Sequence, residues 1–522
     1  MNKGLLIGAA ALFCVNALLF SNPTLAQDQR GDWAVTGADS GQTGWQKDEQ
    51  GLSPETASSF TYLWKIKLGQ PSKNPESFSE PLLAGRLINA QGFKDFVYWA
   101  SADTLYGVDS ALGNLIWKKQ YKSGPASSGC EVSSLGFLME PPVVINFNAR
   151  RKRAPGTPRP PDPPAALPTE RRLGVAPGGG YFGLKGIYVL TPDGMLHEQV
   201  MTTGDDFAPP VKFLPPASGG SYGMNFTNKT IYTATGRNCN SVPNGIWAID
   251  LSKPEYPVTK YSTEKTHTLA LTGPIVTPEG TAIFVTSPAT SDPSQHPGSV
   301  VATDKDLKIT DWFTPADGMA SATSISPVTF PFKEKQLVAA PGKDGSIVLL
   351  DASSLGGADH HSPLFETTPI AKPGAKHAWD GFASWTDKAG TTWVYASIST
   401  EVSLSDGSVK ISGPTPHGGV VAFKVEDNDG KLALKPVWVS ADMVNPAPPR
   451  IANGVVVALS GGDAATHATL YVLNSATGAE LYSSKNTVPT YTHLSGVAVG
   501  DSHAFFTDHE NVLYAFGIPL EH

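Results

Sequence analysis

Polar residues that could bind a ligand or do chemistry stand ahead of a series of short apolar stretches. If those stretches are strands around one axis, the polar side chains meet at one end of it. Oxygen and nitrogen groups in such a ring could bind a polar ligand or a hard cation through oxygen ligands. The alternative for each residue is a solvated loop side chain. The eight are Glu80, Glu140, Asp206, His267, Ser324, Asp380, Asn445 and His493.

The segment richest in such groups is KHAWDGFASW, residues 376–385. It places His377, Trp379 and Asp380 directly before one of the apolar stretches. An alternative interpretation keeps Trp379 and Trp385 as packing residues and makes Asp380 a turn former ahead of a glycine.

A repeated hairpin corner supplies the architecture that must position these residues. In LYVLNSATGAELY, residues 470–482, apolar residues alternate as in a half-buried strand. Asn474 can bond the backbone two residues on, and Gly478 supplies the positive φ that closes the turn. A second copy is LYGVDSALGNLIW, residues 105–117. Weaker copies begin at residues 186, 246, 299, 346, 419 and 512, which makes eight.

A second element, a strand led by proline or small residues, also occurs eight times. Proline is tolerated at the first residue of a strand, where no ladder donor is needed. Units of about 40–55 residues with four strands each predict an all-β, eight-bladed β-propeller. The predicted first strands are 80–85, 140–145, 208–213, 273–277, 326–330, 382–385, 449–452 and 495–499.

The two ends of the repeat region predict how the ring closes. Tyr62–Leu68 is a strand with no earlier strand to pair with, and the chain ends on another strand, Val512–Gly517. If the first completes the last blade, neither is left as an exposed edge. The alternative is that Tyr62–Leu68 caps a sheet of its own.

Composition and the N-terminus set the broader class. The net charge of −8 argues against a nucleic-acid partner, and 52 glycines with 44 prolines suit short strands and turns. Residues 1–26 read as a secretory signal peptide, with an apolar run too short to span a membrane. We therefore expect a periplasmic or secreted protein with an arm at 27–59, a propeller at 60–522 and a Pro/Arg-rich insertion loop at 148–180. After cleavage Cys130 and Cys239 remain, either as one disulfide or as two separate buried thiols.

The corner motif and the opening DWAVTGADSGQTGW resemble the pyrroloquinoline quinone repeat family. Its members include eight-bladed quinoprotein alcohol and sugar dehydrogenases, and non-catalytic relatives such as the outer-membrane assembly lipoprotein of Gram-negative bacteria. The resemblance covers nearly the whole chain after residue 26, except the insertion loop. It implies that the corner aromatic packs onto the next blade, a role that Trp117, Trp312 and Tyr482 keep.

The resemblance also implies roles for individual residues. Asp380 corresponds to a carboxylate that acts as general base on an alcohol as hydride leaves for a calcium-bound quinone. TGRNCN, residues 235–240, resembles a calcium-binding stretch, but Arg237 stands where the amide is expected; Arg237 could instead pair with a ligand carboxylate, or the segment could be only a loop. The implied cofactor-binding set is Glu140, Arg237, Asn238, His377, Trp379 and His493, and the implied metal set is Glu140, Asn238 and Asp380.

Several departures from the catalytic members leave two functions open. No two cysteines are adjacent and no Cys-x-x-Cys-His motif occurs, so the vicinal disulfide and a covalent haem are absent. An electron acceptor must then be a separate protein or a small molecule. The chain is either a quinoprotein-like oxidoreductase or cofactor binder acting on alcohols or sugars, or a scaffold propeller with a filled channel that recognises a protein or glycan. The first requires an open polar mouth with a cation site, and the second predicts apolar side chains that fill it.

Overall fold

The computed structural model describes most of the chain that follows the first 31 residues. The described residues are 32–70, 80–89, 92–121, 135–140, 186–215, 223–235, 244–262, 272–286, 296–315, 326–342, 345–372, 379–404, 407–492 and 496–519. Residues 1–26, the whole of the predicted insertion loop at 148–180, and Cys130 and Cys239 lie outside them. No helix among the described residues is long and apolar enough to cross a membrane.

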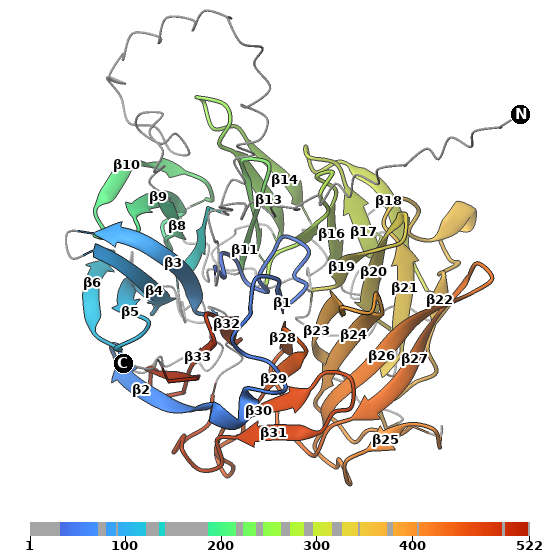
Figure 1. The fold of residues 1–522 in the computed structure, drawn as a ribbon. Coiled ribbons are helices and arrows are strands. Elements are labelled where there is room, and N and C mark those ends of the chain that lie inside the picture. The colour runs from blue at the N-terminus through green and yellow to red at the C-terminus, as the bar shows by residue number, and fades with distance from the viewer. Residues whose placement is uncertain are drawn as a thin grey trace, which may run out of the picture.

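Eight antiparallel sheets stand around a common axis as the blades of a propeller (Figure 1). The first four blades, each given from the innermost strand outward, are β3 (Leu82–Asn89), β4 (Gly92–Ala100), β5 (Thr104–Asp109) and β6 (Leu115–Gln120); β7 (Gly136–Met139), β8 (Gly186–Leu190), β9 (Met195–Val200) and β10 (Asp206–Lys212); β11 (Met224–Thr227), β12 (Thr230–Thr235), β13 (Gly245–Asp250) and β14 (Val258–Ser262); and β15 (Ile275–Val276), β16 (Ala282–Val285), β17 (Val300–Thr303) and β18 (Ile309–Phe313).

The remaining four blades complete the ring, and two of them carry a fifth strand. They are β19 (Val328–Phe332), β20 (Lys335–Pro341), β21 (Ile347–Asp351) and β22 (Phe365–Glu366); β23 (Trp379–Thr386), β24 (Thr392–Ile398), β26 (Gly419–Asn428) and β27 (Lys431–Val439), with β25 (Lys410–Ile411) outside β27; β28 (Arg450–Ala452), β29 (Val455–Ser460), β30 (Thr469–Asn474) and β31 (Glu480–Ser483), with β1 (Trp45–Gln46) beside β28; and β32 (Ala498–Gly500), β33 (His503–Thr507), β34 (Val512–Gly517) and β2 (Thr61–Lys67). Two 3₁₀ turns, η1 (Ala57–Ser59) and η5 (Gly357–Asp359), lie in the connections.

The ring closes as the sequence predicts. β2 is the outermost strand of the eighth blade and pairs antiparallel with β34, from Thr61 opposite Gly517 to Lys67 opposite Val512. The first full strand of the chain therefore shares a sheet with the last one, which removes two free edges.

Alternating residues along each strand pack against different neighbouring blades. In β24, Val394 and Ala396 join an apolar cluster with the fifth blade, whereas Trp393 and Tyr395 join a cluster with the seventh. This period of two is the expected consequence of strand geometry. The core is thus a series of apolar layers between sheets.

Two strand assignments in the second and third blades are wrong. The innermost strand of the second blade is β7, which ends just before Glu140, and residues 141–145 lie outside the described residues. The stretch 208–213, expected as a first strand, belongs largely to β10, the outermost strand of the second blade, and β11 is the true innermost strand of the third. Likewise Gly186–Leu190 is the second strand of its blade, counted from the channel outward, whereas the other copies of the hairpin corner begin in the third strand of theirs.

The corner aromatic docks onto the next blade at three junctions. Trp117 Nε1 donates to the backbone oxygen of Met201 at 2.9 Å, and its ring lies over Gly204. Trp64 and Trp438, which the sequence analysis did not single out, make the same contacts at two other junctions.

The other two predicted corner aromatics pack differently. Tyr482 contacts Phe60 and, in the eighth blade, Phe516, with ring centroids 5.2 and 6.5 Å away. Trp312 does not lie on a glycine; it stacks between His296 and His360, at 4.0 and 3.7 Å. Trp312 therefore keeps a packing role with histidine partners.

Candidate functional site at the channel mouth

The N-terminal arm, residues 32–50, crosses the central channel and hydrogen-bonds the innermost strand of every blade. β1 lies near the centre of the ring in Figure 1, parallel to β28. The arm atoms involved are backbone groups and the Gln46 amide, and the partners come from all eight sheets. These contacts join Trp33 to Leu83, Ala34 to Met139, Ser40 to Asn225 and Val276, Gly41 to Thr329, Thr43 to Ser384, Gly44 to Ile451, and Gln46 to Val499.

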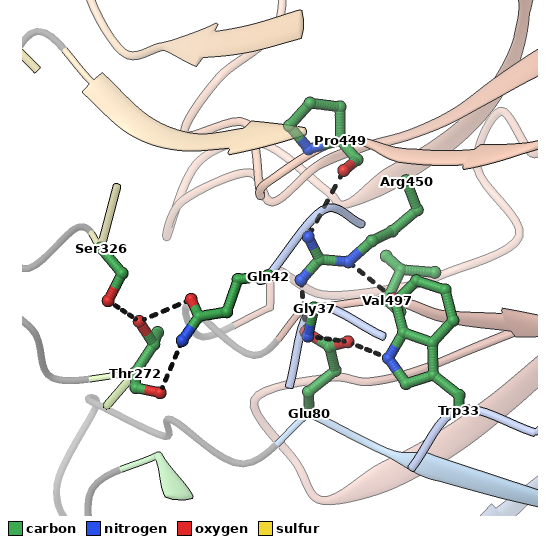
Figure 2. Close-up of polar contacts among 9 residues, drawn as sticks. All are labelled: Trp33, Gly37, Gln42, Glu80, Thr272, Ser326, Pro449, Arg450 and Val497. Carbon is green, nitrogen blue, oxygen red and sulfur yellow. Dashed lines mark hydrogen bonds and ion pairs between the residues drawn. The ribbon is translucent and has the colours of Figure 1, made fainter. Parts of the chain in front are cut away.

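A buried ion pair anchors one side of the arm (Figure 2). Arg450, the first residue of β28, donates to the carboxylate of Glu80, which also accepts from Trp33 Nε1 and the Gly37 amide. The Arg450 guanidinium lies 5.6 Å from the Trp33 ring centre, and its Nε donates to the Val497 oxygen at 3.2 Å. Burial raises the pKa of the Glu80 carboxyl, and the Arg450 charge opposes that rise. Glu80 lies at the predicted mouth, but its carboxylate accepts hydrogen bonds from Arg450 and from Trp33 and Gly37 of the arm instead of facing a ligand.

A second polar cluster joins the arm to the fourth and fifth blades (Figure 2). Gln42 Nε2 donates to the Thr272 and Gly273 oxygens at 3.1 and 3.3 Å, and Gln42 Oε1 accepts from the Thr272 hydroxyl at 3.2 Å. The Ser326 hydroxyl contacts the Thr272 hydroxyl at 2.5 Å. Thr272 and Ser326 precede β15 and β19, so the cluster sits at the same channel end as Glu80.

Asp380 occupies a β-bulge at the start of the innermost strand of the sixth blade. The register between β23 and β24 shifts between Trp379 and Gly381, which leaves Asp380 as the extra residue. Bulges re-aim a side chain and are frequent beside active sites. Four residues further along β23, Ser384 bonds the arm at Thr43 at 2.8 Å. The arm therefore closes the channel below the mouth that Asp380 borders.

The Asp380 carboxyl titrates close to neutral pH. Burial raises its pKa from 3.8 to about 7, and the hydrogen bond donated by the Ser399 hydroxyl works in the opposite direction. A base titrating near the working pH combines a deprotonated fraction with a useful basicity. Asp380 therefore has the electrostatic setting of a general base.

Glu140 lies at the other end of the channel. It follows β7 instead of preceding a strand, and it pairs with Lys229 in the turn between β11 and β12. Since innermost strands run in one direction, Glu140 and Asp380 lie at opposite mouths, and the implied metal set is not brought together. No group of three or more His, Cys, Asp or Glu side chains among the described residues could hold a metal ion.

The structure places the other predicted residues as follows. Asn445 lies ahead of β28 as expected and donates to the Gly462 oxygen at 2.8 Å, whereas Asp206 begins an outermost strand, away from the channel. Trp385 is buried, donates to the Tyr395 hydroxyl and packs edge-on against Trp45, as the packing interpretation predicts. The residues outside the described part of the chain are Arg237, Asn238, His267, Ser324, His377 and His493, together with the side chain of Trp379 and both cysteines of the predicted disulfide, Cys130 and Cys239.

The sequence analysis missed the residues that hold the arm: Trp33, Gln42 and Arg450. One signal in the sequence could have indicated the ion pair. Arg450 is a single charged residue at the start of a short apolar strand, and a buried charge of this kind requires an oppositely charged partner. Its partner Glu80 was identified, but as a residue free to bind a ligand.

Comparison with solved structures shows the fold of quinone-dependent alcohol dehydrogenase propellers. The quinohaemoprotein alcohol dehydrogenase of Comamonas testosteroni matches with a TM-score of 0.57 and 14% identity, over 95% of this chain and 82% of that one. A europium-containing methanol dehydrogenase matches with a TM-score of 0.54 and 11% identity, over 94% of this chain and 99% of that one. The quinohaemoprotein alcohol dehydrogenase ADHIIG of Pseudomonas putida HK5 matches with a TM-score of 0.55 and 12% identity, over 95% of this chain and 81% of that one. No family model and no curated protein matches the chain.

Proposed function

We propose that this chain is an exported propeller oxidoreductase that oxidises a hydroxyl group of a small alcohol or sugar at the channel mouth. The observation that carries the proposal is Asp380, a carboxylate on a bulge at the mouth with a pKa raised to about 7. The likeness of the fold to alcohol and methanol dehydrogenases supports the reaction class.

In this proposal Asp380 removes the substrate hydroxyl proton. The ionised carboxylate accepts the proton as the C–H bond breaks and hydride leaves for an acceptor. Ser399 donates to the carboxylate, so it orients the accepting oxygen and favours the ionised form. The arm lies across the channel below the site, held by hydrogen bonds between its backbone groups and the surrounding strands. It therefore limits the access of bulk water from the channel side.

The described residues fit part of the cofactor chemistry of the resembled family. Asp380 suits the base that a quinone-dependent oxidation requires. Pyrroloquinoline quinone supplies a two-electron acceptor for hydride when it is bound. Glu140 does not fit the expected cation set, because it lies at the other mouth paired with Lys229. The proposed reaction therefore includes no step at a metal ion.

A second function is favoured by the arm itself. A channel crossed by residues 32–50, with hydrogen bonds to all eight innermost strands, supports a scaffold propeller with a plugged channel, although the arm makes polar contacts where apolar side chains were expected. In that case the rim loops recognise a protein or glycan partner, and Asp380 has no substrate.

Ligand binding to the purified protein separates these two functions. We expect pyrroloquinoline quinone, added with and without Ca²⁺, to raise the melting temperature saturably, since a ligand that binds only the folded state stabilises it. Dye-linked assays on alcohols and sugars then test turnover. Asp380→Asn should abolish turnover but keep the thermal shift, and Asp427→Asn, a partly buried carboxylate of the same blade that pairs with Lys333, should change neither. Absence of both shift and turnover would reject the oxidoreductase and leave the scaffold.

A further inference from the structure

A pocket lies between the N-terminal arm and the innermost strand of the third blade. Its volume is about 340 Å³, at the lower end of the range for pockets that bind small ligands. Phe226, at the end of β11, and Asn228, an exposed residue of the turn that follows, form one wall. Because the innermost strands all run away from the mouth that Asp380 borders, this pocket lies at the opposite mouth.

Within this pocket the protein binds an ammonium group of its own. Lys47 Nζ lies 3.0 Å from Asp39 Oδ2 and 5.5 Å from the centre of the Trp45 ring. All three residues line the pocket, and the side chains of Lys47 and Asp39 are 53% and 30% exposed. A dissolved ligand can therefore reach the carboxylate. A carboxylate and an aromatic face are the two groups that bind an ammonium ion most favourably.

The two groups that contact this ammonium are held in place by other parts of the fold. Asp39 Oδ1 accepts from the Gly41 and Thr43 amides, both at 3.1 Å, and Oδ2 accepts from the Thr43 hydroxyl at 2.7 Å. The Trp45 ring packs edge-on against Trp385, with the ring centroids 6.1 Å apart. Groups fixed before binding lose little conformational freedom when a ligand arrives.

The Lys47 ammonium is the replaceable member of this arrangement. Its ion pair with Asp39 is exposed to solvent, and exposed pairs contribute at most about 1 kcal/mol to stability. A ligand ammonium that takes its place therefore loses little affinity to the competition. The same contacts, to Asp39 and to the Trp45 ring, are then made by the ligand.

The other lining residues favour an organic cation. Asp32 and Asp48 also line the pocket, and Lys47 is the single cation among the described residues that do, so an anionic ligand is disfavoured. Val35 and Phe226 contribute apolar surface. A hydrated metal ion would make no use of that surface, whereas an alkyl chain would bury it.

We propose that this pocket binds an alkylammonium ligand, with the ammonium group between Asp39 and Trp45 in place of Lys47. The alkyl chain packs against Val35 and Phe226. The ligand is either a free amine or a lysine side chain of a partner protein, because both carry the same group. The proposal does not depend on oxidation at Asp380, since the two sites lie at opposite mouths.

Calorimetric titration of the purified protein with hexylamine tests this pocket. We expect hexylamine to bind, and hexan-1-ol, which has the same chain without the charge, not to bind. Lys47→Met should tighten the binding of hexylamine about two- to five-fold, because it removes the competing ammonium. Asp39→Asn should weaken it at least about five-fold, the worth of one charge-assisted hydrogen bond.

Lys333→Met is the matched control for Lys47→Met. Lys333 also pairs with a carboxylate, that of Asp427, and lies 5.6 Å from the Phe332 ring centre, but it is not among the residues that line this pocket. It should bind hexylamine as the parent does. Melting temperatures without ligand show whether Asp39→Asn still folds, and the half-exposed Lys47 gives a variant that tests the proposal even if it does not.

The outcomes are distinct. Absence of hexylamine binding would overturn the proposal, and so would binding that Lys47→Met leaves unchanged or weakens. Acetyl-glycyl-lysyl-glycine amide then distinguishes the two sources of the ammonium group. Tighter binding of this peptide than of hexylamine indicates a lysine of a partner protein, and weaker binding indicates a free amine.

Discussion

The Trp438 indole lies against Gly478 of the next blade, and its Nε1 donates to the Ser475 oxygen at 2.9 Å. A Cβ at position 478 would stand 2.6 Å from Trp438 Cε3, which is closer than such atoms approach. The glycine therefore serves both the turn, at φ +68°, and the junction between blades.

Gly478→Ala should reduce the free energy of unfolding by about 1–3 kcal/mol, because it combines a strained φ with crowding of the indole. Urea unfolding followed by tryptophan fluorescence measures the change. Gly430→Ala is the matched control, since Gly430 also has a positive φ, +85°, but open space around its Cβ position. Equal losses in the two variants would show that the contact with Trp438 is unimportant.

Asp380 should make stability fall as pH rises. Its pKa is about 7 in the folded state against 3.8 ordinarily, so between these values the unfolded chain releases a proton that the folded protein retains. Because the unfolded chain binds fewer protons than the folded protein in this range, the contribution of Asp380 to the free energy of unfolding is greatest below about pH 4. It is lost as the pH approaches 7. At about 1.4 kcal/mol per pH unit, the loss is up to about 4 kcal/mol.

Chemical denaturation from pH 4 to 8, compared between the parent and Asp380→Asn, measures this contribution. The difference between the two proteins isolates Asp380 from other titrating groups. A parent and variant with parallel profiles would mean that the Asp380 carboxyl titrates normally.

Ser399→Ala should move the titration of Asp380 to higher pH. The hydroxyl donates to the carboxylate and so favours its ionised form; without it, burial acts unopposed. Carboxyl ¹³C chemical shifts of labelled aspartate report the midpoint. Ser397→Ala, two residues earlier on β24, is the control. A midpoint unchanged or lowered in Ser399→Ala would contradict the assigned hydrogen bond.

Arg450→Met should destabilise the protein by about 3–5 kcal/mol, because it leaves the Glu80 carboxylate buried without its cation. The double variant Arg450→Met with Glu80→Gln should be less destabilised than Arg450→Met alone, since no buried charge remains. Thermal and urea unfolding of four proteins, namely the parent, Arg450→Met, Glu80→Gln and the double variant, give the coupling energy. Additive effects of the two changes would show that Arg450 and Glu80 do not act as a pair.

The periodic parts of the fold could be predicted from the sequence, because they depend on local signals. Asn474 and Gly478 form their turn through bonds within five residues, so the corner is recognisable wherever it recurs. Closure through Tyr62–Leu68 followed from an unpaired strand at each end. The prediction for the second blade was wrong because Gly136–Met139 lacks a leading proline such as those before β3, β15, β19 and β28, while the stretch at 208–213 has one.

The site was less predictable because its contacts join distant residues. Asp380 was found through its neighbours in sequence, but the bulge and the Ser399 bond depend on a strand that follows. Gln46 reaches Val499 across 453 residues, and no pattern near either residue indicates that bond. The filling of the channel by the arm therefore emerged only from the three-dimensional structure.

The arm gives this chain an unusual order of assembly. Residues 32–50 are synthesised first, yet their partners include Ile451 and Val499, which are synthesised among the last. Contacts so far apart in sequence slow folding, since loop closure must precede them. The segment cannot complete its contacts until the eighth blade emerges, although its partners Leu83 and Met139 are synthesised early. Folding should therefore end in a late, cooperative phase that a chain lacking its last blade cannot enter.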